Sequence, residues 1–189
     1  MEIITIGNRK GGIGKSTITA QLAHGLAILG MKTLLISGDS QNDVLKLLGI
    51  TEFPEEGLCY ALENKEFKVD EIKIEVRENL DAIHMESLSL ANKLIDSIKR
   101  PEIRIRKIFD GFHEYDYVLI DTPPSDRPMN DQFYIDCDSI IVPVATNFLS
   151  SSALVAVFDY LEDLDESVDK IKMIIPNLYR VNLNQHNEH

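Results

Sequence analysis

Eight consecutive residues near the start of the chain, Lys10–Thr17, have the composition of a phosphate-binding loop. They read K-G-G-I-G-K-S-T and follow the apolar segment Glu2–Ile6 and the short stretch Gly7–Arg9. Glycines let several backbone N–H groups converge on one anion, because no Cβ blocks the approach and a positive φ costs little. Lys15 supplies positive charge for the phosphates, and the Ser16 hydroxyl can join the coordination shell of Mg²⁺. The octet therefore predicts a site for a nucleotide with Mg²⁺.

The segments around the octet have the order that such a site needs. Glu2–Ile6 is predicted to form a buried strand, and a helix is predicted to begin near Lys15, where its dipole and unpaired N–H groups favour an anion. Gly30 is predicted to cap the end of this helix. Apolar residues recur along it at helical spacing, namely Ile18, Leu22, Leu26 and Leu29. The alternative is a glycine-rich turn that binds nothing, and the strand and helix argue against it.

Two aspartates follow further apolar segments that are predicted to be strands. Asp39 comes just after Lys32–Ser37, and Asp121 ends Tyr117–Asp121 and precedes a double proline. An aspartate at the carboxyl end of a buried parallel strand points into the crevice where open α/β sheets bind ligands. Two other interpretations stay open. Asp39 could cap a helix at Asp43–Leu48, and Asp121 could stabilise a turn.

These three motifs resemble those of the ParA/MinD family of deviant Walker A ATPases, and most of all the small ParA proteins of plasmid and chromosome partition. The octet has Arg9 where the general P-loop has its first glycine, and it carries the early lysine of the deviant loop, Lys10. The segment ending in Gln41 is similar to the family's V-D-x-D-P-Q, with Ser37 and Ser40 at the first aspartate and the proline. The segment at Asp121 resembles Walker B and switch II.

The resemblance implies that the cofactors are ATP and Mg²⁺ and that Lys10, Lys15 and Asp39 are catalytic. Lys10 would reach the nucleotide of a partner copy, and Asp39 would orient the attacking water. Mg²⁺ would lie near Ser16, Asp39 and, through water, Asp121. The expected nucleotide-binding residues are Gly11, Gly12, Ile13, Gly14, Lys15, Ser16 and Thr17.

The function implied by the resemblance is an ATP-dependent homodimer with weak ATPase activity, acting in plasmid or chromosome partition (DNA segregation) with a centromere-binding partner protein. Two alternatives stay open. Ser37 and Ser40 could indicate a nucleotide-gated interaction module with little hydrolysis. The other alternative is a small-molecule ATP-dependent enzyme of the same superfamily, which would not need Lys10.

Alternating strands and helices predict an α/β fold of the P-loop NTPase class, with a mostly parallel sheet covered by helices on both faces. Residues 1–189 are expected to be a single domain that could lack the family's C-terminal helices. The remaining predicted strands are Leu80–His84, Asp138–Val144 and Lys170–Pro176. The remaining predicted helices are Leu58–Leu62, Ala91–Ile98, Ile103–Phe112 and Ser150–Leu164, with a break at Arg100 and Pro101.

The composition agrees with a cytoplasmic protein that has no membrane partner. Hydrophobic residues make up 44% of the 189 residues, and no apolar run approaches the length of a membrane span. Cys59 and Cys137 are too far apart in sequence to suggest a metal pair, and we expect both to be core thiols. His186 and His189, near the C-terminus, are more typical of a frayed end than of a metal site.

The net charge of -12 opposes binding to DNA unless basic residues cluster. One such cluster surrounds Pro101. Arg100, Arg104 and Lys107 would share one face if a helix continued through them, and this face could contact nonspecific DNA. A solvated helix face is the alternative.

Overall fold

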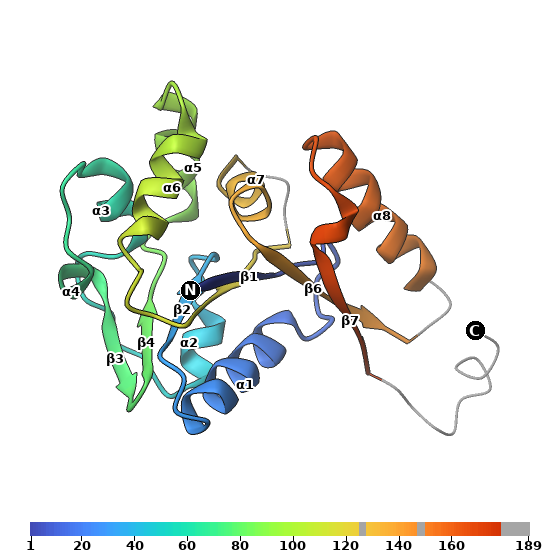
Figure 1. Cartoon of the computed structure of the whole chain (residues 1–189), viewed down its shortest axis with the longest axis horizontal. Helices are drawn as coiled ribbons and strands as arrows, with labels where there is room; N and C mark the ends of the chain where they lie inside the picture. The colour runs from blue at the N-terminus through green and yellow to red at the C-terminus, as the bar shows by residue number, and fades with distance from the viewer. Residues whose placement is uncertain (125–127, 147–149, 179–189) are drawn as a thin grey trace.

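The computed structural model describes residues 1–124, 128–146 and 150–178, and its centre is a seven-stranded sheet in the order β3-β4-β2-β5-β1-β6-β7 (Figure 1). Strand β3 runs antiparallel to β4, and the other pairings are parallel, so the predicted mostly parallel sheet is confirmed. The strands are β1 Glu2–Ile6, β2 Thr33–Ser37, β3 Ile74–Arg77, β4 Leu80–Ile83, β5 Tyr117–Asp121, β6 Ser139–Ala145 and β7 Ile171–Asn177.

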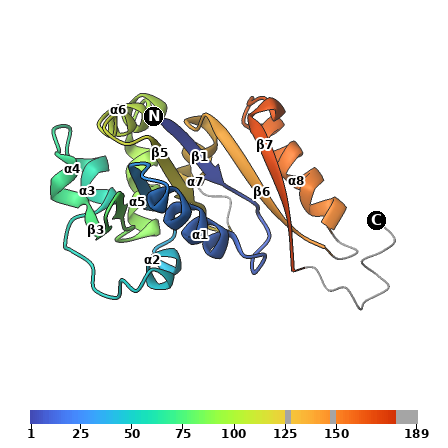
Figure 2. The same ribbon diagram turned by 60° about the horizontal axis from the view of Figure 1, so that its bottom comes forward.

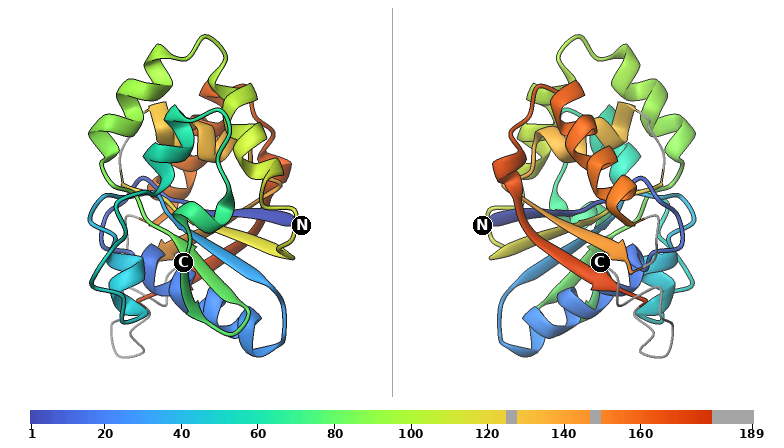
Figure 3. Two further views of the ribbon diagram at one scale, coloured as in Figure 1. Left: turned by 90° about the vertical axis from the view of Figure 1, so that its left-hand side faces the viewer. Right: turned by 90° about the vertical axis from the view of Figure 1, so that its right-hand side faces the viewer.

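Helices cover both faces of the sheet, as predicted, and Figure 3 shows the layers with the sheet nearly edge-on. Alternate strand residues supply the two cores, so that Leu34 and Ile36 face one layer and Leu35 faces the other. One layer holds α1 Lys15–Ile28 and α2 Asp43–Leu47. The other holds α3 Leu58–Glu63, α4 Val69–Ile72, α5 Leu88–Ser97, α6 Pro101–Asp110, α7 Pro128–Ile135 and α8 Ser150–Asp163, and a short 3-10 turn, η1 Val168–Lys170, precedes β7. Within the described ranges, no helix is both long and apolar enough to cross a membrane.

The predicted helices and strands are present with small shifts at their ends. Helix α5 begins at Leu88, earlier than predicted, because the Ser87 hydroxyl accepts a hydrogen bond from the Leu90 N–H at 3.2 Å and caps the helix. The predicted break before α6 is confirmed, since Pro101 occupies the first turn of that helix. The elements not predicted are α4, β3, α7 and η1.

Helix α1 buries its small side chains most fully, whereas Leu22 and Leu26 of the predicted apolar series are partly buried against the same core. Its buried residues are Lys15, Thr19, Ala20, Ala23 and Ala27, whereas Leu29 is 74% exposed. Alanines let the helix axis lie close to a sheet that is already filled with isoleucine and leucine. The predicted C-terminal cap is confirmed, because Gly30 has a φ of 82° and its N–H donates to the Ala27 carbonyl oxygen at 3.0 Å.

The strand order reverses at β1, which lies between β5 and β6, and this places three loops at one edge of the sheet. The carboxyl ends of β1, β2 and β5 are neighbours there, with Ile6 and Ser37 both paired to Asp121. Such a switch point is where open α/β sheets bind ligands. Figure 2 shows α1 in front of the sheet, leading away from this edge.

Candidate nucleotide and magnesium site

The loop from β1 to α1 adopts a conformation that requires glycine at defined positions. Gly12 and Gly14 have φ values of 72° and 90°, in the left-handed region. Gly14 directly precedes α1, so the unpaired N–H groups of the first helical turn face the loop. Gly7 is required for another reason, because a Cβ at this position would overlap with the Tyr134 hydroxyl. The loop therefore has the backbone form of an anion cradle.

Two asparagines that sequence reasoning missed hold this loop in place. Asn8 is buried, donates from Nδ2 to the Pro143 carbonyl oxygen at 2.8 Å, and accepts the Lys10 N–H at 2.9 Å. Asn177, at the end of β7, donates to the Ile13 carbonyl oxygen at 2.8 Å. A polar residue two positions after a buried strand was a signal for Asn8. The contact of Asn177 depends on tertiary structure alone.

Lys15 lies inside the loop with its ammonium near backbone oxygen. It is buried, and Nζ donates to the Lys10 carbonyl oxygen at 3.3 Å. Burial lowers the pKa of Lys15, and the nearby charges of Asp121 and Asp39 act in the opposite direction. The ammonium is therefore positioned beside the glycine cradle, where a phosphate would be a stronger partner than a neutral carbonyl.

Two hydroxyls and one carboxylate form the oxygen cluster at the base of the site. Asp121, which is 3% exposed, accepts a hydrogen bond from the Ser16 hydroxyl at 2.7 Å and lies 3.2 Å from the Thr19 hydroxyl. Oxygen ligands of this kind suit Mg²⁺, which keeps several waters and takes phosphate oxygens. The residues present therefore fit the predicted ion. Thr19 was missed, although it lies one helical turn after Ser16.

Burial raises the pKa of the Asp121 carboxyl group. Desolvation raises its pKa to about 6, although the hydrogen bonds from Ser16 and Thr19 and the charge of Lys15 act against this shift. The folded protein thus holds this proton more tightly than the unfolded chain does. As the pH rises from about 4 to about 6, Asp121 ionises in the folded state, and its contribution to stability is lost.

Replacing Asp121 by asparagine is expected to raise the free energy of unfolding of the nucleotide-free protein by about 2 to 3 kcal/mol at pH 7.5, because a buried charge is removed. The gain is expected to shrink as the pH falls toward about 4, where the wild-type carboxyl is already protonated. Urea unfolding at the two pH values measures this difference. A variant destabilised equally at both pH values would contradict the assignment.

Asp39 lies across the site from Lys15, in the turn between β2 and α2. Its Oδ1 accepts the Gln41 N–H at 3.1 Å, and the Ser37 hydroxyl donates to its carbonyl oxygen at 3.0 Å. The interpretation that Asp39 caps the following helix is wrong, because α2 begins at Asp43 and the residue at its N-cap is Asn42. Ser37 occupies the position of the first aspartate of the family motif. Its hydroxyl stabilises the turn that holds Asp39 at the site.

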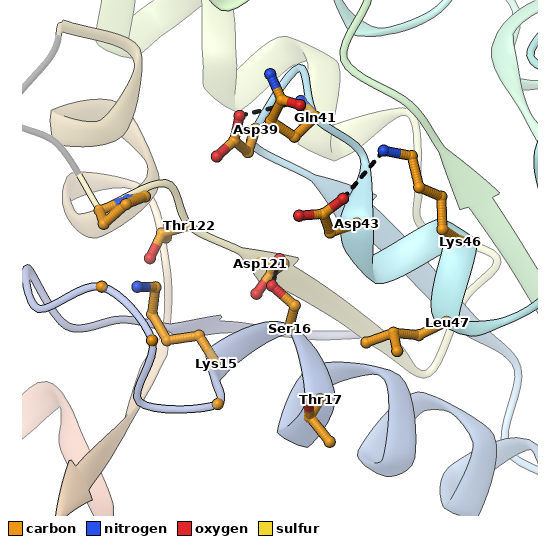
Figure 4. A pocket seen from close by; sticks show the side chains of 14 residues that line it. Lys15, Ser16, Thr17, Asp39, Gln41, Asp43, Lys46, Leu47, Asp121 and Thr122 are labelled. Carbon is orange, nitrogen blue, oxygen red and sulfur yellow. Dashed lines mark hydrogen bonds and ion pairs between the residues drawn. The ribbon is translucent and has the colours of Figure 1, made fainter.

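These side chains surround one cavity of about 660 Å³. Figure 4 shows the P-loop and α1 residues on one side, the β2–α2 residues on the other, and Asp121 between them. The predicted site residues that line it are Gly11, Gly12, Gly14, Lys15, Ser16, Thr17, Asp39 and Asp121. The other lining residues are Gln41, Asp43, Lys46, Leu47, Thr122 and Pro124. Two predicted residues are not part of the lining: Ile13 is buried beneath the loop, and Lys10 is half-buried outside the cavity.

The predicted basic face on α6 does not form, and this corrects the shared-face interpretation. Arg100 precedes the helix, with a φ of -140° and a ψ of 77°, because the helix begins at Pro101. The guanidinium of Arg104 turns inward and donates to backbone carbonyl oxygens at the end of α3, including that of Leu62 at 3.2 Å. Lys107 alone of the three is both helical and exposed.

The two cysteines are buried free thiols, as predicted. Burial raises the pKa of Cys59 to about 12 and that of Cys137 to about 11, so both stay protonated at neutral pH. His186 and His189 lie outside the described residues.

Comparisons with known proteins show the family of this chain. A family model described as an AAA domain matches residues 1–174. The sporulation initiation inhibitor protein Soj of Bacillus subtilis is 30% identical over 182 residues, covering 94% of this chain and 67% of Soj. The chromosome partitioning protein ParA of Caulobacter vibrioides is 26% identical over 187 residues, covering 95% of this chain and 70% of that protein.

A solved structure is similar over nearly the whole chain. It is that of a putative plasmid partition protein from Borrelia burgdorferi bound to AMPPNP, with 28% identity and a TM-score of 0.80. The match covers 98% of this chain and 77% of that protein. That relative holds an ATP analogue on the same fold.

Proposed function

Because this chain belongs to the ParA/Soj family of AAA-domain ATPases, we propose that it is a nucleotide-controlled switch in plasmid or chromosome partition. In this proposal it binds Mg·ATP, dimerises face to face with the nucleotides between the two copies, and loses the dimer on slow hydrolysis. The observation that carries the proposal is the convergence of Lys15, Ser16, Asp39 and Asp121 on one cavity.

Each residue has a task in this proposal. The N–H groups of Gly11, Gly12 and Gly14 and the ammonium of Lys15 hold the phosphates. Ser16 and, through water, Asp121 would hold Mg²⁺, and the bound ion would supply positive charge to neutralise the transferred phosphoryl group. Asp39 faces this group from the β2–α2 turn, where it can hold a water for attack and accept its proton late.

Lys10 is proposed to act on the nucleotide of a partner copy. Two observations support this role. The Lys10 backbone is fixed by Asn8, and the Lys10 side chain is outside the cavity of its own chain. A side chain placed in this way adds charge to a site only when a second copy approaches.

The proposal also includes a partner and a location. A centromere-binding partition protein would stimulate hydrolysis, and the protein would work in the cytoplasm. The relatives named for partition support the process in which such a partner would act. Arg104 is not proposed to contact nonspecific DNA, because its guanidinium donates hydrogen bonds to carbonyl oxygens at the end of α3.

Sedimentation velocity with Mg·ATP and with Mg·ADP tests the dimer. The wild type is expected to be dimeric with ATP alone. The Lys10→Ala variant is expected to stay monomeric with either nucleotide, because the substitution removes the contact that Lys10 would make with the partner copy. The variant should keep its affinity for Mg·ATP.

The matched control is Lys93→Ala, which removes an exposed lysine of α5 far from the loop. This variant should behave as the wild type does. A wild type that is monomeric with both nucleotides would exclude the dimer mechanism. A dimeric Lys10→Ala with normal turnover would favour the small-molecule enzyme.

A further inference from the structure

A second cavity, separate from the nucleotide site, gathers lysines on a protein of net charge -12. Its volume is about 420 Å³, and its charged lining has four lysines, Lys65, Lys68, Lys73 and Lys107, and two carboxylates, Asp70 and Glu114. It lies where the α6–β5 connection leads into the amino end of β5, whereas the nucleotide site lies at the carboxyl ends of the strands. We call this cavity the lysine pocket.

The two segments that build the lysine pocket are about 40 residues apart in sequence and are held together by Arg104. Its guanidinium donates to the carbonyl oxygens of Leu62 at 3.2 Å and Lys65 at 3.4 Å, and more closely to those of Ala61 and Asn64. These bonds cap the carboxyl end of α3 and attach the following loop to α6. The pocket is therefore a product of the packed fold.

An aromatic contact reinforces this arrangement. Phe67 lies so close to Gly111, just past the end of α6, that a Cβ on the glycine would be 3.7 Å from the Phe67 ring. Tyr115 forms another wall, and its hydroxyl donates to Asp81 at 2.7 Å. With these contacts, Lys65 and Lys68 on the loop and Lys107 on α6 line the same cavity.

The lysines of the pocket differ in how their charge is balanced. The ammonium of Lys73 is neutralised by Asp70 at 2.9 Å and Asp81 at 3.4 Å. Those of Lys65, Lys68 and Lys107 form no ion pair within the part of the chain that the structure describes. Three ammonium groups without an ion pair therefore line the cavity, against one lining carboxylate, Glu114, that is not paired with Lys73. This excess of positive charge favours an anion that carries more than one negative charge.

The charges around the pocket favour a compact anion over a long polyanion. Exposed carboxylates flank it in sequence on both segments, at Glu63, Glu66 and Asp110. A long polyanion such as DNA would have to pass these charges, whereas a compact anion can sit inside the cavity. Its volume falls within the range of small-molecule sites.

We propose that the lysine pocket binds a compact phosphorylated anion through Lys65, Lys68 and Lys107. The proposal does not depend on the nucleotide site and stands if the partition function fails. The ligand would be held by charge-assisted hydrogen bonds from the three ammonium groups. Phe67 and Tyr115 would form the apolar wall for any organic part of the ligand.

Calorimetric titration with inorganic pyrophosphate tests the proposal. The host is the Lys15→Ala protein, so that the P-loop does not contribute. One molecule of pyrophosphate is expected to bind per chain. Adding Lys68→Gln and Lys107→Gln to this host should weaken the affinity at least about tenfold, because two charged donors are lost. The matched control adds Lys93→Gln and Lys172→Gln, which remove two exposed lysines outside the pocket and should leave the affinity unchanged.

Three results would overturn the proposal. Pyrophosphate could fail to bind to the Lys15→Ala protein. It could bind equally well when Lys68 and Lys107 are replaced, which would place it elsewhere. A short DNA duplex could bind through these two lysines while pyrophosphate does not, which would make the surface a contact for nucleic acid.

Discussion

Replacing Asp39 by alanine is expected to slow ATP hydrolysis by about a hundredfold or more while Mg·ATP still binds. In the proposed function the phosphates and Mg²⁺ would be held by the loop and by Ser16 and Asp121, and the hydrogen bonds that Lys15 and Ser16 form do not involve Asp39. The variant would lose the group that is proposed to place the attacking water. Because the dimer would be lost only on hydrolysis, we also expect Asp39→Ala to stay dimeric with Mg·ATP for longer than the wild type.

Single-turnover hydrolysis and sedimentation on the same samples measure both effects. The matched control is Asp43→Ala, since Asp43 lines the same cavity but is paired with Lys46 at 3.0 Å. This control should hydrolyse ATP at close to the wild-type rate. Normal hydrolysis by Asp39→Ala would remove Asp39 from the catalytic group and leave the interaction module as the better interpretation.

Replacing Lys15 by alanine is expected to weaken Mg·ATP binding by about a hundredfold or more. Lys15 is buried against the loop, and its ammonium has a backbone carbonyl as its hydrogen-bond partner. Phosphate oxygens that replace this carbonyl would gain a desolvated, charged contact, which is worth far more than a contact at the surface. Loss of the ammonium would leave phosphate charge inside the loop without this cation.

Calorimetry with Mg·AMPPNP measures the affinity without turnover. Lys46→Ala is the matched control, because Lys46 lines the same cavity but is 47% exposed and already paired with Asp43. Its effect should be less than about tenfold, as for other exposed ion pairs. Equal effects of the two substitutions would show that general positive charge, and no specific contact of Lys15, attracts the nucleotide.

Local sequence patterns predicted the elements of the site well. Glycine is favoured where the backbone turns with positive φ, as at Gly12 and Gly14, and a strand is expected before a phosphate-binding loop. Both signals involve neighbours in the chain. The face of α1 could not be predicted in this way, because large and small apolar residues both recur at helical spacing, and only the sheet decides which of them fit.

The basic residues around Pro101 also separate what local spacing predicts from what packing decides. Spacing on a helix suggested that Arg104 and Lys107 share a role. Arg104 instead bonds to the end of α3, and Lys107 joins Lys65 and Lys68 around the lysine pocket. Sequence reasoning could not find these partners, because each lies about 40 residues away from α6.

The phosphate-binding loop, the mostly parallel α/β fold and the positions of the two aspartates after buried strands could be predicted from sequence. Spacing along the chain sets local conformation and the alternation of buried side chains. The tertiary structure alone decided that Asn177 holds the loop, that Lys10 lies outside its own cavity, and that a second basic cavity exists. The physical reason is that these features depend on hydrogen bonds and charges between distant segments, which meet only when the sheet and its helices pack.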